Sequence, residues 1–318
     1  MQKLNSGRGA FSAGLAVALL AGCGGSPTET PGALPLSAVS QLTKRNTSYL
    51  YVSDNQYGVG IVYIFSYPDP SREAVRAITG IGYAYGPCAD PLGKVWVPAE
   101  DRDGATVSEF NHGETKSIAQ IKIPNGDGVG ECAVDPTTGN LAVLGTNAVD
   151  VFKGAVQGKP IRYAIPNVTV IASTYDKRGN LFVDGMEGSS APFLLYELAK
   201  GHDEFARLTL DKTEGFAGGI AWDGQYVAIA TGGNGHAAVI YRFKAVGNMG
   251  KVIQAVHPNG LQVGAWFAVG DGDIVGTSGN SSSGESVVRL WPYPAGGGWI
   301  WRLDGTVETQ GLAISPAR

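Results

Sequence analysis

The sequence predicts an all-β fold, a six-bladed β-propeller with four antiparallel strands in each blade. A unit made of a short apolar strand, a tight turn containing Asp and a second apolar strand recurs six times along the 318 residues. Equivalent positions in the second strand are 45, 46, 40, 45 and 48 residues apart; they are Val52, Val97, Val143, Val183, Ala228 and Gly276. Repeats of this length that contain only strands are typical of propeller blades. The 47 glycines and a charged fraction of only 16% also suit short strands joined by tight turns.

Each repeat divides into four strands, A to D, from the central channel outward. The fourth strands alternate apolar and polar residues, as a half-solvated edge requires. The strands that matter most for a site are the first ones, because they surround the channel. These A strands are expected near Gly86–Ala89, Glu131–Val134, Ile171–Tyr175, Gly219–Trp222, Ala265–Val269 and Gly311–Ser315.

The two ends of the repeat region are incomplete in complementary ways. The first strand, Tyr49–Ser53, is a B strand that no A strand precedes, and the last, Gly311–Ser315, is an A strand that no B strand follows. We therefore expect the C-terminal strand to join the N-terminal blade and to close the ring of six, because an unpaired edge would remain otherwise.

The turn pattern D-x-x-G-N-L-x-V, seen at residues 176–183, resembles that of NHL-repeat propellers and of the related gluconolactonase superfamily. The resemblance covers residues 48 to about 316 and implies a six-bladed propeller. These folds include lactonases, lyases, receptors and scaffolds, so the resemblance implies a fold more strongly than an activity.

The N-terminus reads as an export signal. Lys3 and Arg8 precede an apolar run at residues 10–21, which is too short to span a membrane. The run ends in Leu-Ala-Gly-Cys23, which resembles the lipobox of bacterial lipoproteins; an ordinary secretory signal that happens to contain a cysteine is the alternative. We expect residues 1–22 to be the signal peptide, residues 23–47 a lipidated cysteine with a flexible tether, and residues 48–318 the propeller.

This organisation predicts a protein of the bacterial cell envelope that faces the periplasm or the exterior, on the outer membrane if the host has one. Its partners would be the membrane, through the N-terminal lipid, and an unknown small molecule or protein, and we expect a monomer. Without Lys3 and Arg8 the chain keeps 22 Lys and Arg against 28 Asp and Glu, a net charge of −6. A nucleic-acid-binding surface is not expected with this charge.

The two remaining cysteines occupy equivalent places in successive repeats, Pro-Cys88-Ala and Glu-Cys132-Ala. Equivalent positions of neighbouring blades lie side by side, so a disulfide between two A strands is within reach in an exported protein. Two buried thiols that pack as small apolar groups are the alternative.

Candidate ligand-binding residues lie in the loops expected at one mouth of the channel. The loops that lead into A strands supply Tyr85, Glu131 and Trp266, and the loops between B and C strands supply Asn55, Asp101, Arg102 and His236. Aromatic rings beside carboxylates and amides suit a polar organic ligand such as a sugar or a peptide. The alternative is that Asn and Asp are present because turns favour them.

The gluconolactonase resemblance also implies a divalent metal held by a Glu that opens an A strand. This chain has Tyr85-Gly-Pro where that family has Glu-Gly-Pro, and Glu131 is a substitute in the next blade. A hard cation such as Ca²⁺ needs several converging oxygens, and the four histidines show no metal-ligand spacing. We therefore expect a binding or scaffold module without a cofactor and without identified catalytic residues. The alternative is a metal-dependent lactonase-like hydrolase, or a lyase, with one divalent cation at the channel mouth.

Overall fold

The computed structural model describes residues 47–56, 58–68, 70, 73–124, 128–188, 193–212, 215–232, 238–261, 266–278, 286–306 and 308–317. All of them belong to one unit, Gln41–Arg318. The expected signal peptide, the lipidated Cys23, nearly all of the tether and the candidate residue His236 lie outside the described residues. Within the described ranges, no helix is long and apolar enough to cross a bilayer.

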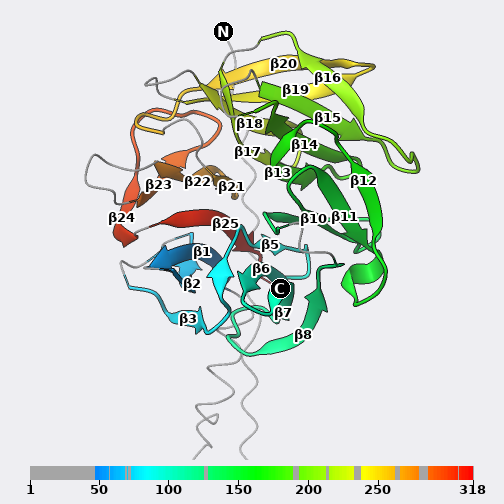
Figure 1. Ribbon diagram of the computed structural model, residues 1–318. Helices are drawn as coiled ribbons and strands as arrows, with labels where there is room; N and C mark the ends of the chain where they lie inside the picture. The colour runs from blue at the N-terminus through cyan, green and yellow to red at the C-terminus, as the bar shows by residue number, and fades with distance from the viewer. Residues whose placement is uncertain are drawn as a thin grey trace, which may run out of the picture. The chain divides into compact units, whose positions relative to one another are not determined.

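Strands dominate the described residues, and a short 3₁₀ turn, η2, lies at Lys153–Ala155. The all-β prediction is confirmed. The strands form sets of four or five that follow the order of the sequence repeats (Figure 1).

The sheets are composed as follows. The first has the order β25 (Thr309–Ser315), β1 (Ser48–Gln56), β2 (Val59–Tyr67), β3 (Arg76–Thr79). In the second, β4 (Tyr83–Ala84) and β5 (Cys88–Ala89) both pair with β6 (Val95–Asp101), which is followed by β7 (Gly104–Phe110) and β8 (Ser117–Lys122). The third contains β9 (Cys132–Val134), β10 (Leu141–Leu144), β11 (Ala148–Phe152) and β12 (Ile161–Ala164).

The remaining strands continue the pattern. One set contains β13 (Thr169–Tyr175), β14 (Leu181–Met186), β15 (Phe193–Leu198) and β16 (Ala206–Leu210). The next contains β17 (Phe216–Trp222), β18 (Val227–Gly232), β19 (Val239–Val246) and β20 (Met249–Val256). The last contains β21 (Phe267–Val269), β22 (Asp273–Ser278), β23 (Ser286–Pro292) and β24 (Trp301–Thr306).

The predicted A strands correspond to β5, β9, β13, β17, β21 and β25, with ends that differ by a few residues. Around the centre of the unit, each of these strands contacts the next, and β25 contacts β5. Figure 1 shows β5, β13, β17, β21 and β25 nearest the centre, with the other strands of each set farther out. The inner strands therefore surround a common axis.

Strand β14 shows why the apolar alternation specifies this arrangement. Leu181 and Val183 pack into one core cluster with residues of β10 and β11, whereas Phe182 between them packs into another with Phe243 and Ile229. The rings of Phe182 and Phe243 meet edge to face with centroids 6.1 Å apart. Because successive side chains of a strand point to opposite faces, one apolar strand serves two neighbouring cores.

An Asp holds the turn that connects the inner strand β13 to β14. The Asp176 carboxylate accepts hydrogen bonds from the backbone N–H groups of Arg178 at 2.8 Å and Asn180 at 2.9 Å. Gly179 in the same turn has a φ of +86°, a conformation that favours glycine. The D-x-x-G-N pattern is thus a turn requirement.

The two ends of the repeat region meet in one sheet. Strand β25 pairs antiparallel with β1, with Tyr49 opposite Ser315 and Val52 opposite Leu312. His112 adds a link, because its ring nitrogens lie 2.6 Å from Ser315 Oγ and 2.8 Å from the Thr47 carbonyl oxygen.

One pairing was not predicted from the sequence. Strand β16 pairs in parallel with β20, through Thr209 opposite Met249 and Leu210 opposite Gly250, and so joins two four-stranded sets into one sheet of eight. The β19–β20 hairpin has eight residues in each strand, so its tip extends to the outer edge of the preceding sheet.

Candidate functional site: a central cavity

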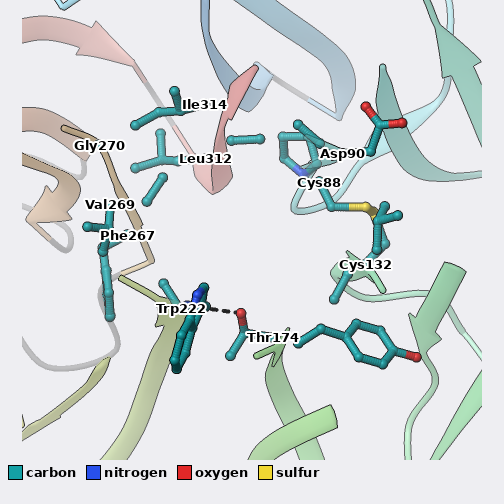
Figure 2. A pocket seen from close by; sticks show the side chains of 18 of the residues that line it. Cys88, Asp90, Cys132, Thr174, Trp222, Phe267, Val269, Gly270, Leu312 and Ile314 are labelled. Atoms are coloured by element: carbon teal, nitrogen blue, oxygen red, sulfur yellow. Dashed lines mark hydrogen bonds between the residues drawn. A yellow bond between two sulfur atoms is a disulfide. The ribbon is translucent and has the colours of Figure 1, made fainter. Parts of the chain in front are cut away.

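A cavity of about 490 Å³ lies among the inner strands. Residues of β5, β9, β13, β17, β21 and β25, and of the turns that follow them, line it. Figure 2 shows side chains from several of these strands around an open centre. The volume is within the range of small-molecule sites in proteins, about 300–1,000 Å³.

The cavity opens at the end where the inner strands enter their Asp-containing turns. Its lining includes Pro91, Pro136 and Asp271, which follow β5, β9 and β21 and are solvent exposed. Ser48 and Pro316, which flank the β1–β25 pair, lie at the same end and also belong to the lining. The turns that define the repeat therefore form the rim of the opening.

The wall is mainly apolar and aromatic. Trp222, Phe267 and Leu312 come from three different inner strands and surround the space in Figure 2. The backbone N–H of Trp222 donates to Thr174 Oγ1 at 3.0 Å, which links β17 to β13 (Figure 2).

A disulfide joins Cys88 of β5 to Cys132 of β9 in the cavity wall (Figure 2). The two Cα atoms are 5.4 Å apart, a separation typical of disulfides. The predicted inter-blade link is confirmed, and it closes a loop of 44 residues.

Glu131 is the residue before β9, and two glycines make room for it. A Cβ atom on Gly86 would lie 2.4 Å from Glu131 Cγ, and one on Gly311 would lie 3.5 Å from Glu131 Oε1 and only 2.3 Å from the Cα of Gly86. The Gly86 and Gly311 backbones therefore approach each other closely beside the carboxyl group. Because these positions have no side chains, the Glu131 side chain occupies the axis of the inner strands.

Burial raises the pKa of Glu131 to about 8. Part of this side chain remains accessible because it lines the cavity, but protein surrounds it and separates it from bulk water. The backbone N–H of Ser173 donates to the carboxylate and offsets part of the increase. Near neutral pH the group is therefore poised to gain or lose a proton.

Asp184 of β14 lies behind Glu131 and is completely buried. Burial raises its pKa well above the usual range, the charge of Glu131 raises it further, and hydrogen bonds from nearby backbone N–H groups lower it in part. The N–H of Ala172 donates to Asp184 Oδ1 at 2.9 Å.

The other sequence-predicted site residues lie away from this cavity. Asn55 is at the other end of β1 from Ser48, and Tyr85 lies between β4 and β5, where its OH group donates to Glu100 Oε2 at 3.4 Å. The Asn55 side chain exchanges two hydrogen bonds of 2.9 Å with the Ala84 backbone, so it holds β1 to β4. Asp101 and Arg102 are exposed in the β6–β7 turn.

Trp266 precedes β21, and its backbone N–H donates to Thr277 Oγ1 at 3.1 Å. It is not among the residues that line the described cavity, whereas Glu131 is. The structure thus brings Tyr85, Asn55 and Asp101 to one side of the inner strands and keeps Glu131 within the channel.

Sequence reasoning missed Ser173, Asp184 and Trp222. Asp184 could have been found from the sequence. The equivalent position of the other repeats carries an uncharged residue, such as Pro98, Leu144, Ile229 or Thr277, so a carboxyl group in this strand is unusual. Trp222 gave no such signal, since an aromatic residue at the end of an inner strand also fits a core position.

The described residues do not fit the metal centre that the gluconolactonase resemblance implies. No group of three or more His, Cys, Asp or Glu among them could hold an ion. Glu131 and Asp184 supply two carboxyl groups, while Ca²⁺ takes six to eight oxygen ligands.

Comparisons with known proteins support the fold. No family model matches the sequence, and no curated protein matches it. A protein of unknown function from Bacteroides caccae is similar in structure, with a TM-score of 0.60 and 14% identity over 85% of this chain and 99% of that one. TolB from Acinetobacter baumannii gives a TM-score of 0.57 and 13% identity over 88% of this chain and 70% of that one.

The WD40 domain of coronin from Toxoplasma gondii is also similar, with a TM-score of 0.55 and 13% identity over 84% of this chain and 69% of that one. These neighbours are β-propeller-like proteins, so the chain has a propeller fold. At such low identity the likeness concerns the fold alone.

Proposed function

We propose that this propeller is a binding module of the bacterial cell envelope, anchored by a lipid on Cys23, which captures a small molecule in its central cavity. The observation that carries the proposal is the cavity of about 490 Å³, which inner strands from every repeat surround. Apolar walls with a few polar groups are what small-molecule sites use. A protein ligand, or a scaffold role, would instead use the outer surface.

Binding in the cavity is tested by filling it. Val269 lies in the wall and is partly exposed there, so Val269→Trp places a large side chain in the space (Figure 2). We expect that small molecules found by ligand-observed NMR with the wild-type protein lose binding to this variant. Val246→Trp is the matched control, because Val246 is 62% exposed at the tip of the β19–β20 hairpin. Compounds that bind Val269→Trp as well as the wild type would contradict the proposal.

We propose further that the propeller has six blades, related to the NHL type, and that β25 closes the ring. The antiparallel pairing of β25 with β1 and the Asp176 turn support this. Deleting residues 311–318 removes most of β25 and exposes the edge of β1, so we expect unfolding or aggregation. Deleting only residues 317–318 leaves β25 intact and is the control. An unchanged melting temperature in the longer deletion would refute closure.

The lipid anchor rests on the Leu-Ala-Gly-Cys23 sequence and on the Gly-, Ser- and Pro-rich segment after it. We expect the wild-type protein to fractionate with membranes as a monomer, with a lipid-modified N-terminal peptide in mass spectrometry. Cys23→Ala should release it into the soluble fraction. Membrane association that survives this substitution would exclude lipid attachment at Cys23.

The hydrolase alternative has one observation in its favour, the neighbouring carboxyl groups of Glu131 and Asp184 with their raised pKa values. Two carboxyl groups that titrate differently suit acid and base roles. A lactone-hydrolysis assay with metal analysis separates the functions. Stoichiometric metal together with turnover that Glu131→Gln abolishes would favour the enzyme over the binding module.

A further inference from the structure

The described residues that line the cavity include acidic side chains and no basic one. Among the described residues that line it, the carboxyl groups are those of Asp90, Glu131 and Asp271, and none is Lys, Arg or His. Asp90 and Asp271 lie at the rim and Glu131 on the axis. A cavity with low-dielectric walls and one sign of charge concentrates ions of the opposite sign.

A buried oxygen without a partner lies beside Glu131. Ser173 belongs to the cavity lining and is only 6% exposed, and its Oγ has no hydrogen-bond partner among the described residues. The Asp184 Oδ2 atom behind it also has no well-formed hydrogen bond in the described part of the chain. A buried polar group left unpaired costs about 1–3 kcal/mol. A ligand that donates hydrogen bonds at this position would recover part of that cost.

Aromatic rings complete the lining. Trp222, Tyr175 and Phe267 come from three inner strands that border the cavity. Rings of this kind bury apolar surface and attract cations over their faces. The lining therefore combines apolar contact area with the polar groups of Glu131 and Ser173 on the axis and the carboxyl groups of Asp90 and Asp271 at the rim.

We infer that the cavity binds organic monocations, molecules with an ammonium group and an apolar body. The ammonium group donates to the Glu131 carboxylate and to Ser173 Oγ, and the apolar body contacts Trp222 and Phe267. This inference rests on the proposed function, because it assigns the ligand class of the same cavity.

Such a ligand would make binding depend on pH. The pKa of Glu131 is about 8, so at lower pH the group must lose its proton before it can pair with a cation. Asp184 faces it from β14, while Asp90 and Asp271 face the cavity from the rim and Tyr67 and Tyr175 from the wall. Burial raises the pKa values of both phenols, so they stay neutral. Affinity should rise from about pH 6 to about pH 9, and binding should release a proton.

The test uses matched probes that share one apolar body: 2-phenylethylammonium, 2-phenylethanol and 3-phenylpropionate. Isothermal titration calorimetry with the wild-type protein at about pH 9 should give a dissociation constant about tenfold lower for the ammonium probe than for the alcohol. The carboxylate should bind most weakly. In buffers of different ionisation enthalpy, the measured heat should reveal proton release at about pH 7.

Glu131→Gln should remove the preference for the ammonium probe and the proton release, while Glu204→Gln, at an exposed position, is the control that keeps both. Asp90→Asn is a second variant. Because Asp90 lies at the rim and not on the channel axis, this substitution should weaken the preference for the ammonium probe over the alcohol only slightly. Equal binding of the ammonium and alcohol probes, blocked by Val269→Trp, would overturn the cation assignment and leave the binding function standing. Binding of none of the probes, with compounds of other classes blocked by Val269→Trp, would also overturn it. If no compound binds in the cavity of the wild-type protein, both the cation assignment and the proposed binding function are overturned.

Discussion

Carboxyl groups in two regions of this propeller experience opposite environments. In the turns at the rim, hydrogen bonds from Thr138 and Thr137 outweigh burial and lower the pKa of Asp135, and those from Arg242 and Tyr226 do the same for Asp223. On the channel axis, burial dominates and raises the pKa values of Glu131 and Asp184. The same functional group is thus held ionised in one region and favours its neutral form in the other.

The difference lies in the number of donors that each region supplies. The Asp223 carboxylate accepts from the N–H groups of Gln225 and Tyr226, from Arg242 Nε at 2.6 Å and from Tyr293 OH at 2.8 Å. Around Glu131, in contrast, the glycines at positions 86 and 311 bring backbone but no side-chain donor. Turn carboxylates stabilise the fold, whereas channel carboxylates cost stability that a ligand can recover.

The largest effect is expected for Asp223→Ala. This substitution removes the acceptor of two backbone N–H groups, the partner of Arg242, and the acceptor of Tyr293, so Arg242 loses its counterion in a largely buried site. We expect a loss of about 3 kcal/mol in the free energy of unfolding, measured by urea denaturation. A loss below about 1 kcal/mol would mean that turn carboxylates are not stabilising, and the contrast between the regions would fail.

A change of opposite sign is expected for Glu131→Gln. A carboxyl group whose pKa is raised in the folded state contributes stability that is full below the unfolded value of 4.5 and is lost as the pH rises through about 8. The neutral amide avoids this loss, so the variant should be more stable than the wild type by about 2 kcal/mol at about pH 6, where the carboxyl group is ionised in the unfolded chain only, and nearly equal to it at about pH 4. Thermal unfolding at both pH values measures this, and a constant difference would contradict the raised pKa.

A smaller cost is expected for Gly86→Ala. The new methyl group would lie 2.4 Å from Glu131 Cγ, so the Glu131 side chain must move. Because that side chain is flexible, we expect a loss of about 1 kcal/mol in the free energy of unfolding. The cost should shrink in a Gly86→Ala, Glu131→Ala double variant, and a double-mutant cycle measures the coupling. Strict additivity would show that Gly86 does not make room for Glu131.

The smallest effect is expected for Asp135→Asn. The amide keeps the Oδ1 acceptor that receives the Thr137 N–H at 2.8 Å, and its NH₂ group can donate to Thr138 Oγ1, the present donor to Oδ2. Folding lowers the pKa of Asp135, so its charge stabilises the fold at pH values above the pKa that the group has in the unfolded chain. This stabilisation is lost as the pH falls through the pKa of the group in the folded protein. We expect the free energy of unfolding to fall by less than about 1 kcal/mol at about pH 7, with a smaller difference towards about pH 3. Urea midpoints that are equal for the variant and the wild type at all pH values would refute this.

The sequence predicted the all-β propeller fold, the inner strands and the disulfide, because all three depend on local repetition. Turns held by an Asp recur at Asp90, Asp135, Asp176 and Asp223, and equivalent positions of successive units become neighbours, as Cys88 and Cys132 show. The parallel pairing of β16 with β20 escaped prediction because it depends on the length of one hairpin.

The candidate site was harder to predict, since the sequence does not reveal which end of the inner strands leaves an open space. Loops rich in polar residues suggested the end with Tyr85 and Asn55, yet Asn55 binds the Ala84 backbone and Tyr85 pairs with Glu100. These contacts are specific to single loops rather than repeated. The cavity lies at the end of the Asp turns, where the repeats are most alike.

Ser48 and Pro316 flank the paired strands β1 and β25 and border the cavity, and the Ala317 N–H donates to Ser48 Oγ at 2.9 Å. An affinity tag or fluorescent protein fused after residue 317 would therefore begin at the entrance and compete with ligands for access. A tag inserted in the β19–β20 turn, at residues 247–248, would start from an exposed hairpin tip outside the cavity lining. Immobilisation through that hairpin would leave the entrance free in binding assays.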